Sequence, residues 1–201
     1  MTTIHLTSAR LIIRSPRIED APAISAAVHA SAAELQTWMP WATPLPTLEQ
    51  STANLAEAIA HTVADQEYRL LLTLRDGTLV GSSGIHALNW AIPRGEIGYW
   101  LDIRHAGRGY ATEATEALTT FARDVMGLRR IEIIVSDRNV RSWRVPERLG
   151  YTLEGILREH RINPDGRRDH TRIYARVTPD ARGQGPWAEL HQRAADTLSA
   201  G

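Results

Sequence analysis

The chain has 201 residues, of which 43% are hydrophobic, and its 23 basic and 23 acidic residues give a formal net charge of zero. This length fits one domain with its own core, and the balanced charge argues against a nucleic-acid or membrane-surface partner. No apolar run approaches the ~20 residues of a membrane helix, and the N-terminus lacks the apolar core of a signal peptide, so we expect a cytoplasmic protein.

Two residue types are absent, which limits the chemistry. The chain has no cysteine, and all of its basic residues other than histidine are arginines. A thiolate nucleophile, a disulfide, a Walker lysine and a Schiff base are therefore excluded. No pair of histidines has the spacing of a zinc site, and we expect no metal.

The N-terminal half begins with a strand and continues into helices. Arg10–Ser15 alternates like a strand, and the alanine-rich stretch Ile18–Ala32 is typical of a helix. Leu35–Pro46 contains three prolines and two tryptophans without a clear period, which predicts a loop. Thr47 and Gln50 have the spacing of a capping box, so a second helix should start there and reach about residue 66.

The middle of the chain predicts three strands and a helix. Tyr68–Arg75 and Thr78–Leu88 are joined by an Asp-Gly turn and should form an antiparallel hairpin. Gly95–Ile103 reads as a further strand, and Thr112–Met126 has the apolar spacing of one helix face.

The last part predicts one more buried strand, a short helix and a second hairpin. These are Arg130–Ser136, Ser142–Leu149, and the strands Tyr151–His160 and His170–Val177. We expect one domain over residues 1–178 and an extension over 179–201 with a possible helix. The element order predicts an α/β (α+β mixed) fold, a mixed sheet with helices on both faces, in which residues 95–136 form a parallel strand-helix-strand unit.

A glycine-rich turn, Gly107-Arg108-Gly109, precedes the helix of this parallel unit. A helix N-terminus has unpaired N–H groups and a partial positive charge, and glycines let an anion approach them closely. A phosphate is the expected occupant, although two glycines in a turn can serve the backbone alone. A dinucleotide fingerprint would need a third glycine where Thr112 stands, and a P-loop would need a lysine.

Several segments together resemble the GNAT N-acetyltransferase superfamily, in particular its RimJ/RimL-type branch. They are WMPW, GEIGYWLD, GRGYATEA, Asn139-x-x-Ser142, LGYTLEG and IYAR, in this order between Leu11 and Arg176. The resemblance implies a GNAT fold, with a mostly antiparallel, twisted sheet of about seven strands. It also implies acetyl-CoA as the acyl donor and a primary amine as the acceptor.

The resemblance also implies which residues bind the donor. The pyrophosphate would lie on the backbone of the glycine turn and the helix start, the pantetheine arm would pair with the strand before the turn, and an N–H near Leu101 would contact the thioester oxygen. The implied residues are Leu101, Ile103, Gly107, Arg108, Gly109, Tyr110, Ala111, Thr112, Asn139 and Ser142.

Glu96 is the candidate general base, because it shares a strand face with Trp100 and a carboxylate there could accept the proton of the acceptor amine. An ion-paired surface glutamate is the alternative. The branch can also carry a glutamate on the strand after LEG, where this chain has Arg161 with Glu159 and His160 beside it. The base therefore remains open between these groups and a water chain.

The position of the tyrosine that many GNAT enzymes use is Pro146 here. The resemblance to the RimJ/RimL-type branch instead implies Ser142 as the candidate acid for the leaving thiolate. A serine there is also a typical N-cap for the helix that follows. The absence of cysteine favours direct transfer in a ternary complex over an acyl-enzyme.

The resemblance implies an acceptor site at Trp38 and Trp41, and we count His86 and Trp100 among its candidate residues. Burial of the tryptophans in the core is the alternative. The leading hypothesis is acetylation of a protein or peptide N-terminal α-amine. The alternatives are acetylation of a small amine (an antibiotic, polyamine or aminoacyl compound) and a CoA-binding module without turnover. The chain should act as a monomer or homodimer.

Overall fold

The computed structural model describes residues 3–199, and within them the strands form one eight-stranded sheet in the order β1-β2-β3-β4-β5-β6-β8-β7. The strands are β1 His5–Thr7, β2 Leu11–Arg14, β3 Tyr68–Leu74, β4 Leu79–Asn89, β5 Arg94–Leu101, β6 Arg130–Ser136, β7 Thr152–Ile162 and β8 Arg168–Val177. All neighbours pair antiparallel except β5 and β6, which are parallel. The mixed α/β class with a mostly antiparallel sheet is confirmed, with one strand more than expected.

The helices are α1 Ala21–Ala30, α2 Ala32–Trp38, α3 Leu48–Val63, α4 Tyr110–Asp124, α5 Val140–Arg148 and α6 Pro186–Ser199. Three short 3-10 turns accompany them, η1 Ile18–Asp20, η2 Pro40–Ala42 and η3 Ile103–His105. Within the described part of the chain, none of these helices combines the length and the apolar character that crossing a membrane requires.

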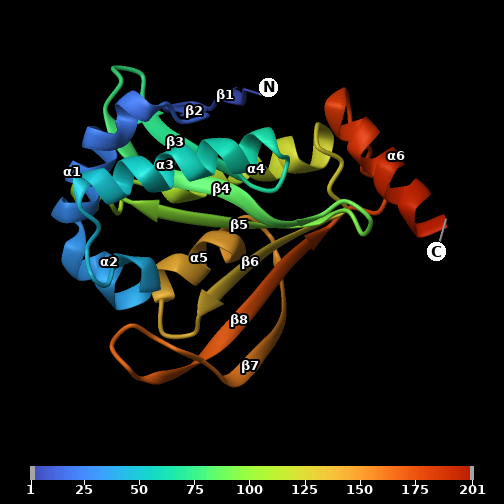
Figure 1. The fold of residues 1–201 in the computed structure, drawn as a ribbon. Coiled ribbons are helices and arrows are strands. Elements are labelled where there is room, and N and C mark those ends of the chain that lie inside the picture. The colour runs from blue at the N-terminus through green and yellow to red at the C-terminus, as the bar shows by residue number, and fades with distance from the viewer. Residues whose placement is uncertain (1–2, 200–201) are drawn as a thin grey trace.

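The two layers of helices cover opposite faces of the sheet (Figure 1). Ile97 on β5 belongs to the main core together with Ala114 and Leu118 of α4. Trp100, three residues further along the same strand, points to the other face and packs against the cluster that contains Val28 of α1. The sheet is therefore covered by α4 on one side and by the α1–α3 layer on the other.

Near the N-terminus one prediction is wrong and one strand was missed. The stretch predicted as one helix and a loop forms two helices, because the chain leaves helical geometry at Ser31 and α2 then continues to Trp38. The Ser31 hydroxyl accepts a hydrogen bond from the Ile103 N–H at 2.9 Å, which ties this break to the end of β5. The edge strand β1 was not predicted at all.

The capping box was predicted correctly. The Thr47 hydroxyl accepts from the Gln50 N–H at 3.2 Å, and the Gln50 side chain accepts from the Thr47 N–H at 2.8 Å. Helix α3 accordingly begins at Leu48.

The C-terminal segment packs against the same core. Trp187 at the start of α6 is buried, its indole N–H donates to the Tyr68 hydroxyl at 3.1 Å, and its ring lies edge-on to Phe121 at 5.4 Å. The helix expected at residues 187–198 is present as α6.

The parallel strands β5 and β6 separate after three paired residues, and Figure 1 shows the opening between them. Their pairing stops at Glu96 and Glu132. Beyond that point β5 stays paired with β4 as far as Leu101, and β6 stays paired with β8 as far as Ser136. The facing edges of the two strands therefore lack each other's backbone hydrogen bonds.

Candidate active site

Helix α4 starts directly after the glycine turn, with Gly109 as its N-cap. Gly107 and Gly109 have φ angles of +78° and +82°, in the left-handed region that glycine adopts most easily. The first helical hydrogen bond runs from the Glu113 N–H to the Gly109 carbonyl at 3.1 Å. The helix thus begins at Tyr110, two residues before the predicted Thr112.

The N–H groups around this helix start are available to a ligand. Over residues 3–199, no hydrogen-bond acceptor is assigned to the backbone N–H groups of residues 107–112. A side chain at Gly107 would meet no atom within 4 Å, so the turn is open to the outside. Together with the positive end of the helix dipole, these groups form a site for an anion.

An ion pair from the β1–β2 turn holds this helix start in place. The Glu113 carboxylate accepts from the Arg10 backbone N–H at 2.6 Å, from Arg10 Nε at 2.7 Å and from the Ser8 hydroxyl at 2.7 Å. Arg10 also donates to the Arg108 carbonyl at 2.9 Å and lies 4.6 Å above the Tyr110 ring. Burial favours a high pKa for Glu113, but these bonds outweigh it and lower the pKa.

A cavity of about 650 Å³ extends from the opening between β5 and β6 toward the α1–α3 layer. The predicted residues that line it are Trp38, Trp41, His86, Glu96, Trp100, Asn139 and Ser142. The remaining predicted positions, Leu101, Ile103 and residues 107–112, lie outside its lining. The structure thus separates an anion site at the helix start from a cavity that holds both candidate catalytic residues.

Ile103 was predicted to contact the donor, but its backbone N–H already donates to Ser31. This bond belongs to the fold, because it connects η3 to the break between α1 and α2. Leu101, the last residue of β5, is half-buried and pairs with Gly81 of β4.

Glu96 has a direct partner in the cavity. It stands opposite His86 in the β4–β5 register, and His86 Nε2 lies 3.5 Å from the carboxylate. The hydrogen bond with Glu96 raises the pKa of His86, against the opposing effect of burial. His86, predicted as a rim residue of the acceptor site, is therefore the direct partner of the candidate base.

Ser142 does not cap α5, so that interpretation of its role is wrong. The N-cap is Asn139, whose side-chain oxygen accepts from the Ser142 N–H at 3.1 Å. Helix α5 begins at Val140, which puts Ser142 inside its first turn. The Ser142 hydroxyl therefore has no capping role. The side-chain oxygen of Asn139 is occupied by the cap, and its amide nitrogen remains as a hydrogen-bond donor.

Tyr99 is a site residue that sequence reasoning missed. Its hydroxyl donates to the Ser142 carbonyl at 2.8 Å and accepts from the Ser142 hydroxyl at 3.2 Å. Burial raises the pKa of Tyr99, so the phenol keeps its proton. The available signal was a tyrosine within a predicted strand, since a phenol that a strand covers usually needs a hydrogen-bond partner.

The wall formed by the α1–α3 layer is aromatic with a polar margin. Trp41 and Trp100 lie with ring centroids 6.2 Å apart, as expected for a shared apolar surface. Ser51 and Asn54 of α3, which sequence reasoning also missed, line the same space. The Ser51 hydroxyl is buried and has no hydrogen-bond partner among residues 3–199.

The three residues on β7 that bear on the choice of base differ in position. Arg161 lines the cavity, whereas Glu159 and His160 do not. The Glu159 carboxylate lies 3.6 Å from Arg168, and His160 Nδ1 lies 3.1 Å from the Thr171 hydroxyl. Of the two carboxylates that are candidates for the base, Glu96 and Glu159, only Glu96 lines the cavity.

Residues 10–152 match the family described as "Acetyltransferase (GNAT) domain", which covers well over half of the chain. This chain belongs to the GNAT acetyltransferase family, and it is an N-acetyltransferase. Among curated relatives, "Probable N-acetyltransferase YjcK" of Bacillus subtilis is 32% identical over 136 residues, which is 67% of this chain and 75% of that protein.

Two further relatives belong to the RimJ/RimL-type branch. The "Ribosomal-protein-serine acetyltransferase" of Escherichia coli is 27% identical over 71% of this chain and 80% of its own length. The solved structure of RimL, a ribosomal L7/L12 alpha-N-protein acetyltransferase in complex with coenzyme A, is 25% identical. It has a TM-score of 0.80 and covers 88% of this chain and 98% of that chain. The predicted resemblance is thereby confirmed.

Proposed function

We propose that this chain transfers the acetyl group of acetyl-CoA to the N-terminal α-amine of a protein or peptide, by direct attack in a ternary complex. The observation that carries the proposal is the row of unpaired N–H groups at the start of α4, beside the opening between β5 and β6. The relatives support the choice of acceptor, because two of them are named for acetylating ribosomal proteins.

The residues at the helix start fit a diphosphate. Backbone N–H groups with no internal acceptor and an exposed arginine, Arg108, match the charge and hydrogen-bonding capacity of such a group. The unpaired β5 edge beyond Glu96 can pair with the amides of the pantetheine arm as an added strand would. Asn139 and Ser142 line the cavity that begins at the opening between β5 and β6.

The Glu96–His86 couple accepts the proton that the acceptor amine must lose before it attacks. An α-amine with a pKa near ~8 costs about 1.4 kcal/mol to deprotonate at pH 7, whereas a lysine amine near ~10.4 costs about 4 to 5 kcal/mol. A single carboxylate-imidazole couple suffices for the smaller cost. Glu96 raises the pKa of His86, so the imidazole is the member of the couple that can hold the proton.

The departing thiolate needs a proton or a hydrogen bond, which the Ser142–Tyr99 pair can provide. When bound, acetyl-CoA supplies an acetyl group activated as a thioester. The Ser142 hydroxyl borders the cavity and can turn its proton toward the thiolate, and the Tyr99 hydroxyl, 3.2 Å away, can then donate a hydrogen bond to the Ser142 oxygen. The raised pKa of Tyr99 keeps the phenol protonated at neutral pH, so it can act as this donor.

A thiol-release assay with acetyl-CoA tests the proposal. Peptides that begin with Ser or Ala are compared with small amines, among them polyamines, aminoglycosides and aminoacyl compounds. Acetylation of the peptide α-amine, checked by mass spectrometry, is the expected result. Turnover of small amines alone would favour the small-molecule alternative, and tight acetyl-CoA binding without turnover of any acceptor would favour a CoA-binding module.

A further inference from the structure

Arg161 projects onto the cavity because of an irregularity in β7. The β7–β8 register shifts between Leu157 and Arg161, and Glu159 within this bulge has a φ angle of +52°. After the bulge, Arg161 stands opposite Asp169 of β8, so both side chains leave the same face of the sheet. Arg161 lines the cavity and is half-buried there.

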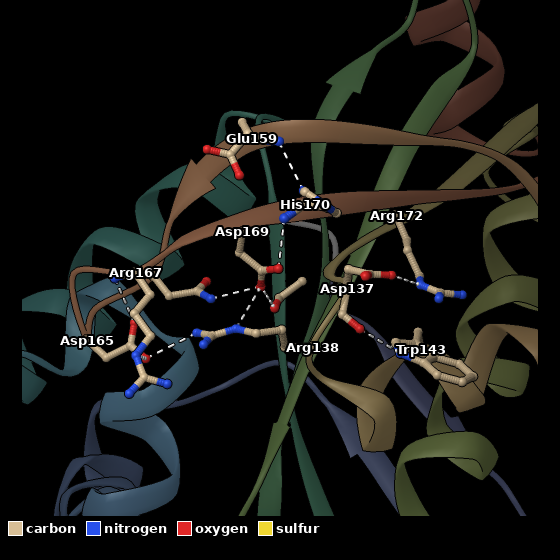
Figure 2. A network of polar contacts seen from close by, with 11 residues as sticks. Asp137, Arg138, Trp143, Glu159, Asp165, Arg167, Asp169, His170 and Arg172 are labelled. Atoms are coloured by element: carbon tan, nitrogen blue, oxygen red, sulfur yellow. Dashed lines mark hydrogen bonds and ion pairs between the residues drawn. The ribbon is translucent and has the colours of Figure 1, made fainter.

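The carboxylate opposite Arg161 is already engaged by other donors (Figure 2). Asp169 accepts from the Ser136 hydroxyl, from Asn163 Nδ2 at 2.8 Å and from the His170 N–H at 2.7 Å. Arg138 Nε lies 3.5 Å from the same carboxylate. Across residues 3–199, Arg161 itself has no assigned ion pair or side-chain hydrogen bond.

The opposite side of the cavity carries negative charge. Glu57 of α3, Glu67 just before β3 and Glu96 of β5 all line it. Arg69 and His86 offset part of this charge through contacts of 3.3 Å and 3.5 Å with Glu67 and Glu96. Among residues 3–199, the cavity thus presents carboxylates on one side and the unpaired guanidinium of Arg161 on the other.

This distribution matches an acceptor that carries both signs of charge. An ammonium group would approach the carboxylates near Glu96, and an anionic group on the same molecule would satisfy Arg161. A ligand that fills this space would supply a partner for Arg161.

We propose that the acceptor is a peptide N-terminus with an acidic side chain within its first few residues, and that Arg161 selects it by pairing with that carboxylate. The inference rests on the proposed function, because it refines the acceptor of the same reaction. Arg161 belongs to β7, which is separated by β8 from β6 and from the opening where the donor would bind. We therefore assign the anion that pairs with Arg161 to the acceptor.

The test measures kcat/KM for three sets of three peptides that begin with Ser. The peptides of a set differ only in having Glu, Gln or Lys at one position, which is the second, third or fourth. The wild-type enzyme should favour the Glu peptide over the Gln peptide by about tenfold at the best position. Arg161→Gln should bring this ratio close to one, and Arg161→Glu should reverse the order in favour of the Lys peptide. Arg158→Gln, a change on the exposed part of the same strand, should keep the wild-type ratio.

Two results would overturn the inference while leaving the proposed function in place. One is equal turnover of the Glu and Gln peptides by the wild-type enzyme, a result that needs no variant to fold. The other is an acidic preference that survives in Arg161→Gln. If no peptide is acetylated and only small amines react, the proposed function fails and the inference fails with it.

Discussion

Replacing Gly109 by alanine should weaken acetyl-CoA binding more than its cost in stability explains. Gly109 has a φ angle of +82°, and an alanine in that conformation costs about 1 to 2 kcal/mol. The added Cβ would meet only the end of the Arg10 side chain, at 3.4 Å, so the strain comes from the backbone. The turn can relieve it by rotating, which turns the N–H groups at the helix start away from the diphosphate.

The expected loss follows from those N–H groups. A hydrogen bond to a charged group is worth about 1.5 to 3 kcal/mol, so losing one raises the Kd for acetyl-CoA by about 10-fold to 100-fold. Isothermal titration calorimetry measures the Kd, and urea denaturation measures the free energy of unfolding.

A matched control separates binding from strain. Gly150 also has a positive φ angle, +72°, and a Cβ there would meet nothing within 4 Å. Gly150→Ala should lower the free energy of unfolding by a similar 1 to 2 kcal/mol and leave the Kd unchanged. If Gly109→Ala loses stability as Gly150→Ala does and binds acetyl-CoA as tightly as the wild type, the role assigned to the helix start is wrong.

Two further predictions concern proton transfer. Because Glu96 raises the pKa of His86, protonated His86 stabilises the fold below its ordinary pKa of ~6.5, and this contribution should disappear as the pH rises through the raised value. Denaturation at pH 5.5 to 9 should show this loss of stability in the wild type and not in His86→Gln. In Glu96→Gln, the acidic limb of the pH profile of kcat/KM should move. Ser142→Ala and Tyr99→Phe should each lower kcat by about 10-fold or more while sparing the Kd for acetyl-CoA. A full rate in both variants would show that the thiolate leaves without this pair.

Local patterns were enough to predict the framework of the site. The parallel unit could be read from a strand, a glycine turn and an amphipathic helix in succession, and the Thr47 capping box is a signal of four residues. These features depend on neighbouring residues alone. That the strand before the turn has an edge free for the pantetheine arm was implied only by the family resemblance.

Features that depend on distant contacts escaped prediction. Strand β1 has three residues and no apolar period, and the Arg10–Glu113 ion pair joins positions more than a hundred residues apart. Asn139 and Ser142 are both good capping residues, so composition could not say which one begins α5. The sequence showed that Arg161 departs from the family pattern. Its position in the cavity lining depends on a β-bulge that no sequence pattern predicts.

The binding of a diphosphate by the main chain at the start of α4 is tested most directly by NMR titration of the ¹⁵N-labelled protein with acetyl-CoA. The amide resonances of residues 107–112 should shift as acetyl-CoA is added, and acetyl-pantetheine, which lacks the diphosphate, should leave them in place. If those resonances stay unchanged at saturating acetyl-CoA, the donor does not bind at this helix start, and the proposed mechanism is wrong.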